Sequence, residues 1–354
     1  MVQSDRSVGT RWRRTAFVLA ASGRRLGRCL LVVGLLCALG DRGARATSPP
    51  LAEVHVVALP GVERRIDHFA VDPAGNRLFV AALGNGTLEV LDIAGGKRLT
   101  SIPGLKEPQG VAYLPSVHRI VAAMRGGGVE AFDDRDYRRA TTMSGMSDAD
   151  NLRFDAARGQ LYVGYGEGAL GVIDPASMTR IADIQLPGHP ESFRLEDTGP
   201  RIFVNVPDTR EIVIVDRAQR SNVAHIPLGN LLNNYPMSLD DSGHRLFVAV
   251  RQPARLLVFD TASIKQIASV SCVGDSDDLF YDARRDRVYV VGGEGFVDTF
   301  DASSSGKYVR IGRLATRAGA RTGLWSPELD RLFVASPQRG GHQAEIHVLA
   351  PGST

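Results

Sequence analysis

Residues 76–92 read N-R-L-F-V-A-A-L-G-N-G-T-L-E-V-L-D, and this stretch decides the fold. Residues 78–81 are apolar and rich in strand-forming types, residues 84–86 read Gly-Asn-Gly, and the run after them alternates apolar with polar side chains. A period of two indicates a strand, and a short glycine-rich segment between two such runs indicates a turn. The stretch therefore predicts a β-hairpin that closes at Asp92.

The same hairpin recurs along the chain. Its first strand is repeated seven times as an apolar triplet, in steps of 42, 41, 41, 44, 42 and 44 residues. The triplets are Leu78-Phe79-Val80, Ile120-Val121-Ala122, Leu161-Tyr162-Val163, Ile202-Phe203-Val204, Leu246-Phe247-Val248, Val288-Tyr289-Val290 and Leu332-Phe333-Val334. A repeat of about 40 residues is typical of propellers and solenoids.

An aspartate closes the second strand of the hairpin in every copy except the last. These residues are Asp92, Asp133, Asp174, Asp216, Asp260 and Asp301. A short carboxylate at the end of a strand can accept hydrogen bonds from the N–H groups of the following turn. We therefore expect them to be structural.

Each repeat except the last holds four apolar runs, and none of the runs shows a sustained helical period. This predicts an all-β fold, a seven-bladed β-propeller of four-stranded blades, occupying residues 47–354. The expected blades lie near residues 66–108, 109–150, 151–191, 192–236, 237–278, 279–320 and 321–350. The last repeat lacks a fourth strand, so we expect the unassigned strand 52–59 to complete it and close the ring.

Residues 1–46 have the pattern of a signal peptide. They contain nine arginines, a 12-residue apolar run at 29–40, and then Ala44-Arg45-Ala46. The run is too short to span a bilayer unaided, so we expect cleavage after Ala46, no stable membrane span afterwards, and a periplasmic or secreted location in a bacterium. Two of the three cysteines lie in this segment, which leaves Cys272 without an intramolecular disulfide partner.

The charge of the chain also depends on this segment. The whole sequence carries a formal charge of +3, but residues 47–354 hold 33 Lys and Arg against 37 Asp and Glu, a net charge of −4. A net-negative body without a basic stripe disfavours a nucleic-acid partner. A small polar ligand or a periplasmic protein is the expected partner instead.

The unit R-L-F-V-A-x-x-G-x-G-T-L-E-V-L-D resembles the YVTN-type repeat of the YncE-like exported bacterial propellers. The resemblance covers residues 51–350. It implies an exported seven-bladed propeller, but no particular reaction, because propellers serve as enzymes and as interaction platforms alike.

Counting back from each triplet reveals a polar ring. In a propeller, the loops that enter the innermost strands surround the mouth of the central channel, together with the turns between the second and third strands. Eleven residues before the triplets stand Asp67, Gln109, Asp150, Glu191, Tyr235, Asp277 and Arg321, and one residue later stand His68, Gly110, Asn151, Ser192, Pro236, Asp278 and Thr322. We expect both sets at the mouth.

Carboxylates gather in this ring. The segments that begin at Asp148 and Asp275 match at a constant offset of 127 residues, three blades apart, so Asp150 and Asp277 are expected to face each other across the channel. Carboxylates that converge in a partly desolvated site must be protonated, paired or bound to a cation. Arg321, His68 or His189 can supply the positive charge. Otherwise Asp150, Glu191 and Asp277 are predicted to bind calcium or magnesium.

A structural role for these polar side chains is an equal alternative. They can satisfy N–H groups of tight loops and otherwise meet only water. If the mouth does bind a ligand, the candidate ligand-binding residues on this face are Gln109, Asn151, Tyr235, Asp278, Arg321, Arg125 and Arg251.

Three functions are compatible with this pattern. The leading hypothesis is a protein that binds a small polar ligand, a cation or a protein partner at the channel mouth, without chemistry. The second is a metal-dependent hydrolase resembling the SMP-30 and gluconolactonase propellers, with Asp150, Asn151, Glu191 and Asp277 as ligands and Asp67, His68 or His189 as acid or base. Blade number and ligand order differ from that family. The third is an interaction platform that uses the outer blade surfaces.

Overall fold

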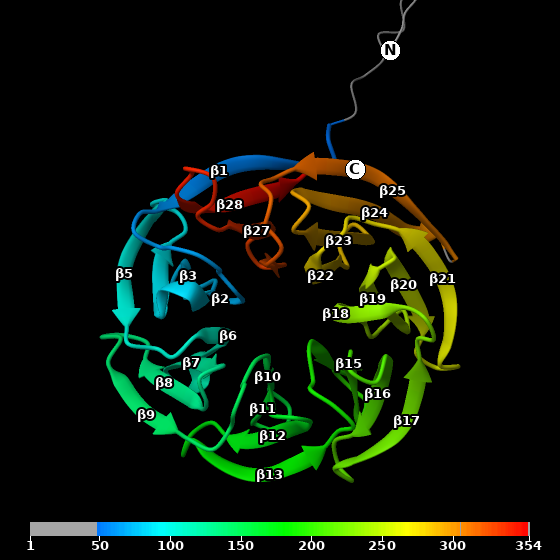
Figure 1. Cartoon of the computed structure of the whole chain (residues 1–354), viewed down its shortest axis with the longest axis horizontal. Coiled ribbons are helices and arrows are strands. Elements are labelled where there is room, and N and C mark those ends of the chain that lie inside the picture. The colour runs from blue at the N-terminus through cyan, green and yellow to red at the C-terminus, as the bar shows by residue number, and fades with distance from the viewer. Residues whose placement is uncertain (1–47, 305, 353–354) are drawn as a thin grey trace, which may run out of the picture. The chain divides into compact units, whose positions relative to one another are not determined.

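The computed structural model describes residues 48–304 and 306–352, and the strands of this part form seven four-stranded antiparallel sheets arranged in a ring (Figure 1). This confirms the predicted seven-bladed β-propeller. The expected signal peptide, residues 1–46, lies outside the described residues. Among the residues described, no helix is long and apolar enough to cross a bilayer.

The blades are numbered here in chain order. Blade 1 contains β2 (Phe69–Asp72), β3 (Arg77–Ala82), β4 (Thr87–Asp92) and β5 (Lys97–Pro103). Blade 2 contains β6 (Pro108–Leu114), β7 (Arg119–Met124), β8 (Val129–Asp133) and β9 (Arg139–Met143). Blade 3 contains β10 (Leu152–Asp155), β11 (Gln160–Tyr165), β12 (Ala169–Asp174) and β13 (Thr179–Gln185). Blade 4 contains β14 (Phe193–Leu195), β15 (Arg201–Val206), β16 (Glu211–Asp216) and β17 (Ser221–Pro227).

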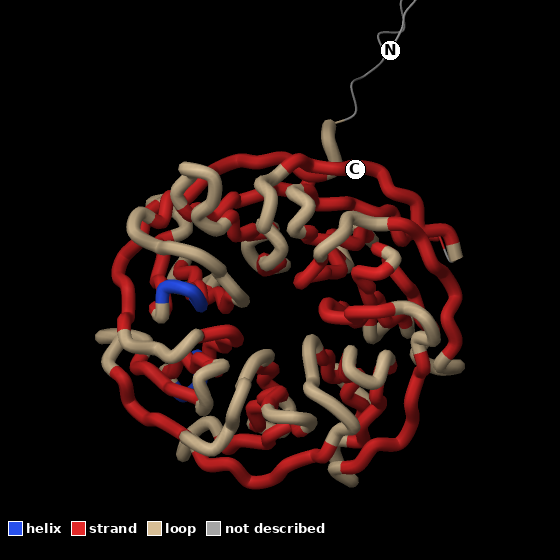
Figure 2. Tube along the Cα trace, viewed as in Figure 1, coloured by secondary structure: helices blue, strands red, loops and turns tan. Residues whose placement is uncertain are grey.

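The remaining blades follow the same order from the innermost to the outermost strand. Blade 5 contains β18 (Leu232–Asp240), β19 (Arg245–Gln252), β20 (Ala254–Asp260) and β21 (Lys265–Ser271). Blade 6 contains β22 (Ser276–Asp282), β23 (Arg287–Gly292), β24 (Phe296–Ser304) and β25 (Lys307–Ala315). Blade 7 contains β26 (Gly323–Ser326), β27 (Arg331–Ser336), β28 (Ala344–Pro351) and β1 (Leu51–Leu59). Two short 3-10 helices, η1 (Leu83–Asn85) and η2 (Pro115–Val117), lie in the connections β3–β4 and β6–β7, and Figure 2 draws helices in blue.

Blade 7 is built from both ends of the described chain. β1 runs antiparallel to β28, with Leu51 opposite Pro351 and Leu59 opposite Ala344. β1 thereby covers the N–H and C=O groups of β28, which would otherwise form an open sheet edge. Figure 1 shows the blue strand β1 along the outside of the red strand β28.

The apolar triplets explain why the blades stay together. In blade 1, Leu78 and Val80 pack in an apolar cluster shared with blade 7, whereas Phe79 between them packs in a cluster shared with blade 2. Successive side chains of a strand point to opposite faces of the sheet. One triplet therefore supplies buried side chains to two neighbouring blades.

Arginines at the start of second strands join neighbouring blades. Arg77 at the start of β3 pairs with Asp72 through Nη2 at 2.8 Å, and its Nη1 donates to the carbonyl of Asp134 in blade 2. Arg245 repeats this arrangement, pairing with Asp240 and donating to the carbonyl of Ala302 in blade 6 at 2.6 Å. A guanidinium has donors enough for both partners, so it can stabilise the hairpin and the interface between blades.

The closing aspartates have the predicted structural role. All six accept a backbone N–H from the turn that follows, at 2.6 to 3.0 Å; the donors are Gly95, Arg135, Ser177, Gln219, Ser263 and Ser303. This prediction is confirmed. These carboxylates stabilise turns and are separate from the channel.

The blade boundaries differ slightly from the expected ones. β6, β18 and β22 begin at residues 108, 232 and 276, each within the range expected for the preceding blade. The pairing register of each of these strands shifts near its start. A bulge allows a strand to pair with its neighbour on both sides of the register shift. These innermost strands therefore begin closer to the mouth than the apolar pattern indicates.

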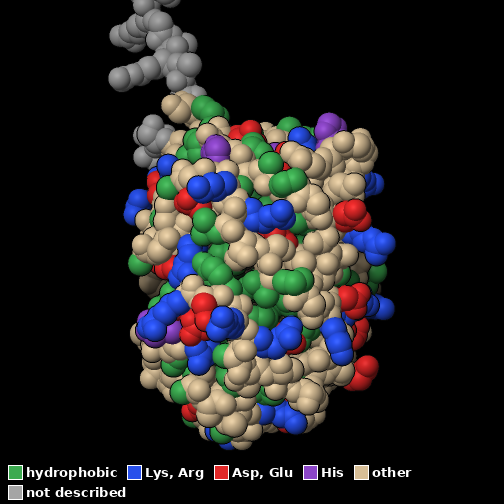
Figure 3. Space-filling view, turned by 90° about the vertical axis from the view of Figure 1, so that its left-hand side faces the viewer, with side chains coloured by type: hydrophobic (Ala, Val, Ile, Leu, Met, Phe, Trp, Pro, Cys, Tyr) green, Lys and Arg blue, Asp and Glu red, His purple; other side chains and the backbone are tan. Residues whose placement is uncertain are grey.

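The outer wall of the ring exposes a few large hydrophobic side chains among the described residues. The exposed large hydrophobic residues lie on the outermost strands of different blades: Val54, Leu99, Ile181, Val223, Ile267, Val309 and Ile311. Figure 3 shows one side of this wall, where hydrophobic side chains gather toward the middle of the face and charged side chains surround them. Single exposed apolar residues are ordinary on protein surfaces, so these residues do not by themselves mark an interface.

We predict that Arg77→Met lowers the free energy of unfolding by about 3 kcal/mol, because it leaves the buried carboxylate of Asp72 without its cation. Arg119→Met is the matched control. Arg119 also begins a second strand, but it pairs with the partly exposed Asp133 at 3.4 Å, and the loss should be below about 1 kcal/mol. Urea unfolding measures both, and equal losses would contradict this role.

Candidate functional site

The polar ring surrounds a cavity of about 220 Å³. Six of its seven predicted residues line this cavity: Gln109, Asp150, Glu191, Tyr235, Asp277 and Arg321. His189, Arg125 and Arg251, which were predicted from neighbouring loops and turns, line it as well. Asp67, the seventh ring residue, is buried beside them with 1% of its surface exposed.

Bulges at the start of the innermost strands place these side chains. In blade 3 the N–H of Asp150 donates to the carbonyl of Gly164, and the N–H of Gly164 donates to the carbonyl of Asn151. Two residues of one strand thus oppose one residue of the next. In blade 4 the N–H of Glu191 likewise donates to the carbonyl of Asn205, and the N–H of Asn205 donates to the carbonyl of Ser192. Such a bulge redirects consecutive side chains, which explains why the ring residue and its successor both face the channel.

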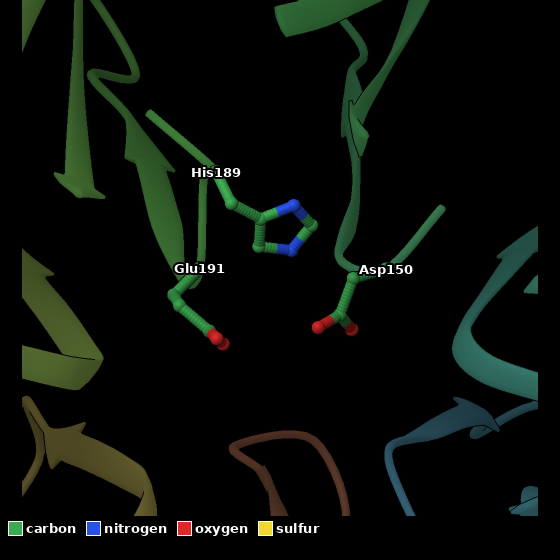
Figure 4. Close-up of side chains that lie close together, drawn as sticks. All are labelled: Asp150, His189 and Glu191. Atoms are coloured by element: carbon green, nitrogen blue, oxygen red, sulfur yellow. The ribbon is translucent and has the colours of Figure 1, made fainter. Parts of the chain in front are cut away.

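Asp150, His189 and Glu191 form a group at the mouth that could hold a metal ion. One ligand atom from each of the three lies within 4.8 Å of the others. Figure 4 shows the imidazole of His189 between the two carboxylates, with one ring nitrogen on their side. Bonds from metal ions to carboxylates or imidazoles are about 2.0–2.2 Å long, so one ion could contact all three after small side-chain movements.

The loop of residues 186–192 holds His189 in a defined orientation. The backbone N–H of His189 donates to Oδ2 of Asp208 at 3.2 Å, and the Nδ1 atom of its ring lies 2.6 Å from the carbonyl oxygen of Gly166. A carbonyl only accepts, so Nδ1 carries the hydrogen. In the neutral ring Nε2 then presents its lone pair, which is the form of histidine that binds a metal.

The carboxylates of this group are costly to keep charged. Burial, together with the nearby charge of Asp67, raises the pKa of Asp150 to about 6. Burial and the charges of Asp150 and Asp277 raise the pKa of Glu191 well above its ordinary value. In the described part of the protein, Glu191 has neither an ion pair nor a side-chain hydrogen bond. A bound cation would relieve this repulsion.

The other side of the mouth is occupied by arginines. Arg251 donates to Oδ1 of Asp277 at 2.5 Å, its Nη1 lies 3.3 Å from Asp275, and its guanidinium lies 4.2 Å above the ring centre of Tyr235. Arg321 donates to Asp275 at 3.0 Å. The structure thus differs from the predicted metal set: Asp277 is not part of the Asp150 group, because Arg251 holds it.

A second layer lies beneath the mouth. His68 sits among three carboxylates, with Nδ1 3.3 Å from Asp278 and Nε2 3.6 Å from Asp67 and 3.8 Å from Asp150. Burial disfavours the imidazolium, but these carboxylates outweigh burial and raise the pKa of His68 to about 10. His68 therefore acts as a fixed positive charge here, which does not suit the role of a general base.

The remaining predicted residues have mainly structural contacts. Gln109 donates to the carbonyl of Ala149 at 3.4 Å, and Asp278 accepts the N–H of Gly323 at 2.8 Å. Asn151 accepts from Arg153 at 3.0 Å. Arg125 is largely exposed, 3.7 Å from Asp148.

Sequence reasoning missed three charged residues of the mouth. Asp148 and Asp275 begin the two segments that match at an offset of 127 residues, which was a usable signal, and Asp275 binds both Arg251 and Arg321. Arg65 lies in the connection before β2, 2.9 Å from Asp67 and 3.9 Å from Asp277. Arg65 stands two residues before Asp67, the same repeat position that Asp148 and Asp275 occupy before Asp150 and Asp277, so counting back thirteen residues from the triplets would have found all three.

Comparison with known proteins supports the fold alone. No family model matches the chain, and no curated protein matches its sequence. Among solved structures, a chain of the Kuenenia stuttgartiensis hydrazine synthase superposes with a TM-score of 0.69 at 14% identity, covering 78% of this chain and 96% of that one. A chain from the crystal structure of a mitotic checkpoint complex gives 0.74 at 13% identity, covering 92% and 99%. The likeness to YncE-like propellers stays a prediction.

We predict that His68 of the metal-free protein remains protonated at pH 8 and loses its proton only near pH 10. The folded pKa lies above the ordinary 6.5, so this group stabilises the fold fully below about pH 6.5, and the contribution disappears as pH rises through 10. Nitrogen-15 NMR of histidine-labelled protein in EDTA reads the titration, with His68→Asn assigning the signal. A midpoint near 6.5 would show that the carboxylates do not hold the charge.

Proposed function

We propose that this protein is an exported binding protein whose channel mouth holds a divalent metal ion through Asp150, His189 and Glu191. The observation that carries the proposal is the convergence of these three ligand atoms within 4.8 Å, with Nδ1 of His189 already engaged by the Gly166 carbonyl. The location outside the cytoplasm is proposed from the sequence pattern of residues 1–46, which is that of a signal peptide.

The ligand set favours a transition metal over the calcium or magnesium expected from the sequence. Calcium and magnesium prefer oxygen ligands alone, whereas imidazole suits zinc and similar ions. His189 contributes a nitrogen to two carboxylates, so zinc or manganese is the better match. Three protein ligands leave positions open for water or for a small polar molecule.

The arginine side of the mouth sets the chemistry of that molecule. Arg65, Arg251 and Arg321 line the same cavity as the proposed metal ligands. Each also has a carboxylate nearby, so the arginine side of the mouth is close to neutral. A small ligand with an oxygen atom for the metal and a polar group for the guanidinium donors fits this arrangement. The cavity of about 220 Å³ limits its size.

A metal-assisted hydrolase is the second candidate. Catalytic zinc sites combine three nitrogen or oxygen ligands with an open position, and donors opposite the metal can stabilise a developing oxyanion. The group at Asp150 meets the first condition and Arg251 is placed for the second. In this candidate His68 supplies positive charge and His189 is a metal ligand, so of the three predicted acid or base residues Asp67 is left to handle protons.

We predict that the purified protein binds one equivalent of zinc or manganese and that Glu191→Gln and His189→Ala each weaken binding at least tenfold. Titration calorimetry and elemental analysis measure this. Asp148→Asn is the matched control, because it removes a carboxylate that lines the same cavity outside the group of three.

The same titration has a defined pH dependence. Protons compete with the metal for Asp150, whose pKa is raised to about 6 by burial and Asp67, so affinity should fall as pH drops from 7 to 5. Metal binding that is absent, or equally strong in both variants, would contradict the proposed site.

For the second candidate we expect zinc- or manganese-dependent hydrolysis of some member of a panel of lactones and carboxylic esters. Asp150→Ala should abolish turnover, whereas Asp277→Ala should mainly lower kcat, because Arg251 loses the carboxylate that positions it to stabilise the oxyanion. Circular dichroism confirms that both variants fold. The absence of turnover with or without added metal removes this candidate and leaves the binding function standing.

A further inference from the structure

A second cavity of about 290 Å³ lies along the innermost strands beyond the mouth ring. Its lining includes His68, Asn151 and Asp278, each of which stands one residue after a member of the polar ring. It also includes residues that stand three positions after a ring member. The side chains of a strand face the same side at every second residue, so these two sets share the channel. We call this cavity the inner chamber.

Two arginines of adjacent blades face this chamber. Arg153 of β10 and Arg194 of β14 stand three residues after Asp150 and Glu191. The equivalent residues of the other blades are small or apolar: Ala70, Ala112, Ser238, Phe280 and Leu324. The two arginines are therefore confined to one side of the chamber, and the third cation of its lining, His68, lies among the carboxylates of Asp67, Asp150 and Asp278.

Neither arginine has a carboxylate partner within 4.0 Å in the described part of the chain. Arg153 donates to the carbonyl of Leu152 at 2.6 Å and to Asn151 at 3.0 Å. Arg194 donates through Nη1 to Ser192 and to the carbonyl of Phe193, at 3.3 and 3.0 Å. Its Nε and Nη2 make no hydrogen bond to any described residue. By contrast, Arg77 and Arg245 on second strands each pair with an aspartate.

Holding these two charges together is unfavourable. Burial lowers the pKa of Arg153 to about 10, and burial together with the charge of Arg153 lowers the pKa of Arg194 well below its ordinary value. Asp278, whose charge acts on both arginines, is already shared with His68 and with the N–H of Gly323. Free guanidinium donors beside a second guanidinium form a site that an anion would stabilise.

The blades on the other side of the ring give the chamber an apolar wall. Phe280 of β22 and Leu324 and Trp325 of β26 line it. An occupant therefore meets charged donors on one side and aromatic or aliphatic surface on the other, which is the usual character of small-molecule cavities.

We propose that the inner chamber binds a small organic anion, a carboxylate or a phosphate monoester. The charged head lies against Arg153 and Arg194, and the apolar body contacts Phe280 and Trp325. A single-ring compound suits a cavity of about 290 Å³. This site is separate from the proposed metal site and needs no metal.

The test is titration calorimetry of the purified full-length protein in EDTA with four probes: benzoate, phenyl phosphate, inorganic phosphate and benzyl alcohol. We expect benzoate or phenyl phosphate to bind, inorganic phosphate to bind more weakly, and benzyl alcohol not to bind. Tighter binding of benzoate indicates a carboxylate ligand, and tighter binding of phenyl phosphate indicates a phosphate ligand. EDTA separates this result from the fate of the metal site.

Variants assign the binding to the two arginines. Arg153→Gln and Arg194→Gln should each weaken the bound probe 10- to 100-fold, since hydrogen bonds to a charged group are lost. Their melting temperatures without probe should stay unchanged or rise, because an unpaired charge is removed. Arg138→Gln removes the same charge from a side chain that is 86% exposed and should bind as wild type. No binding by either organic anion, or unchanged affinity in both chamber variants, overturns the proposal.

Discussion

The constraint on which this structure depends is that each blade must bury both of its faces against a neighbour. The apolar triplets satisfy this requirement because successive side chains of a strand point to opposite faces of the blade. Leu78 and Val80 pack toward blade 7, and Phe79 packs toward blade 2. The same demand applies at all seven interfaces, each of which has its own apolar cluster. Arginines such as Arg77 and Arg245 add polar links between blades, and β1 covers the last edge by pairing with β28.

The contacts between blades stabilise the ring without the side chains at the start of the innermost strands. Those side chains can therefore serve a function. A bulge at the start of these strands directs consecutive side chains into the channel, so charges from different blades meet there. The mouth separates into a carboxylate and histidine group around Asp150 and an arginine side around Asp277. Below it, His68 supplies a fixed positive charge, and the inner chamber adds two arginines without carboxylate partners.

Much of this organisation could be predicted from the sequence, because the repeat is a local pattern. The triplets predict the blades, and counting back eleven residues finds six residues that line the mouth cavity. Pairing across blades was not predictable. His189 joins Asp150 through the shape of its loop, and Arg251 neutralises Asp277 from a different blade. The inner chamber did leave a signal, since Arg153 and Arg194 stand where other repeats have Ala, Ser, Phe or Leu.

The central claim is that one metal ion binds between Asp150, His189 and Glu191. The most direct measurement is anomalous X-ray diffraction from crystals grown with zinc or manganese, recorded on both sides of the absorption edge of the metal. We predict a single strong anomalous peak at about 2.0–2.2 Å from Nε2 of His189 and from a carboxylate oxygen of each acid. A mouth without a peak, or a peak bound elsewhere with these three side chains unchanged, would contradict the account.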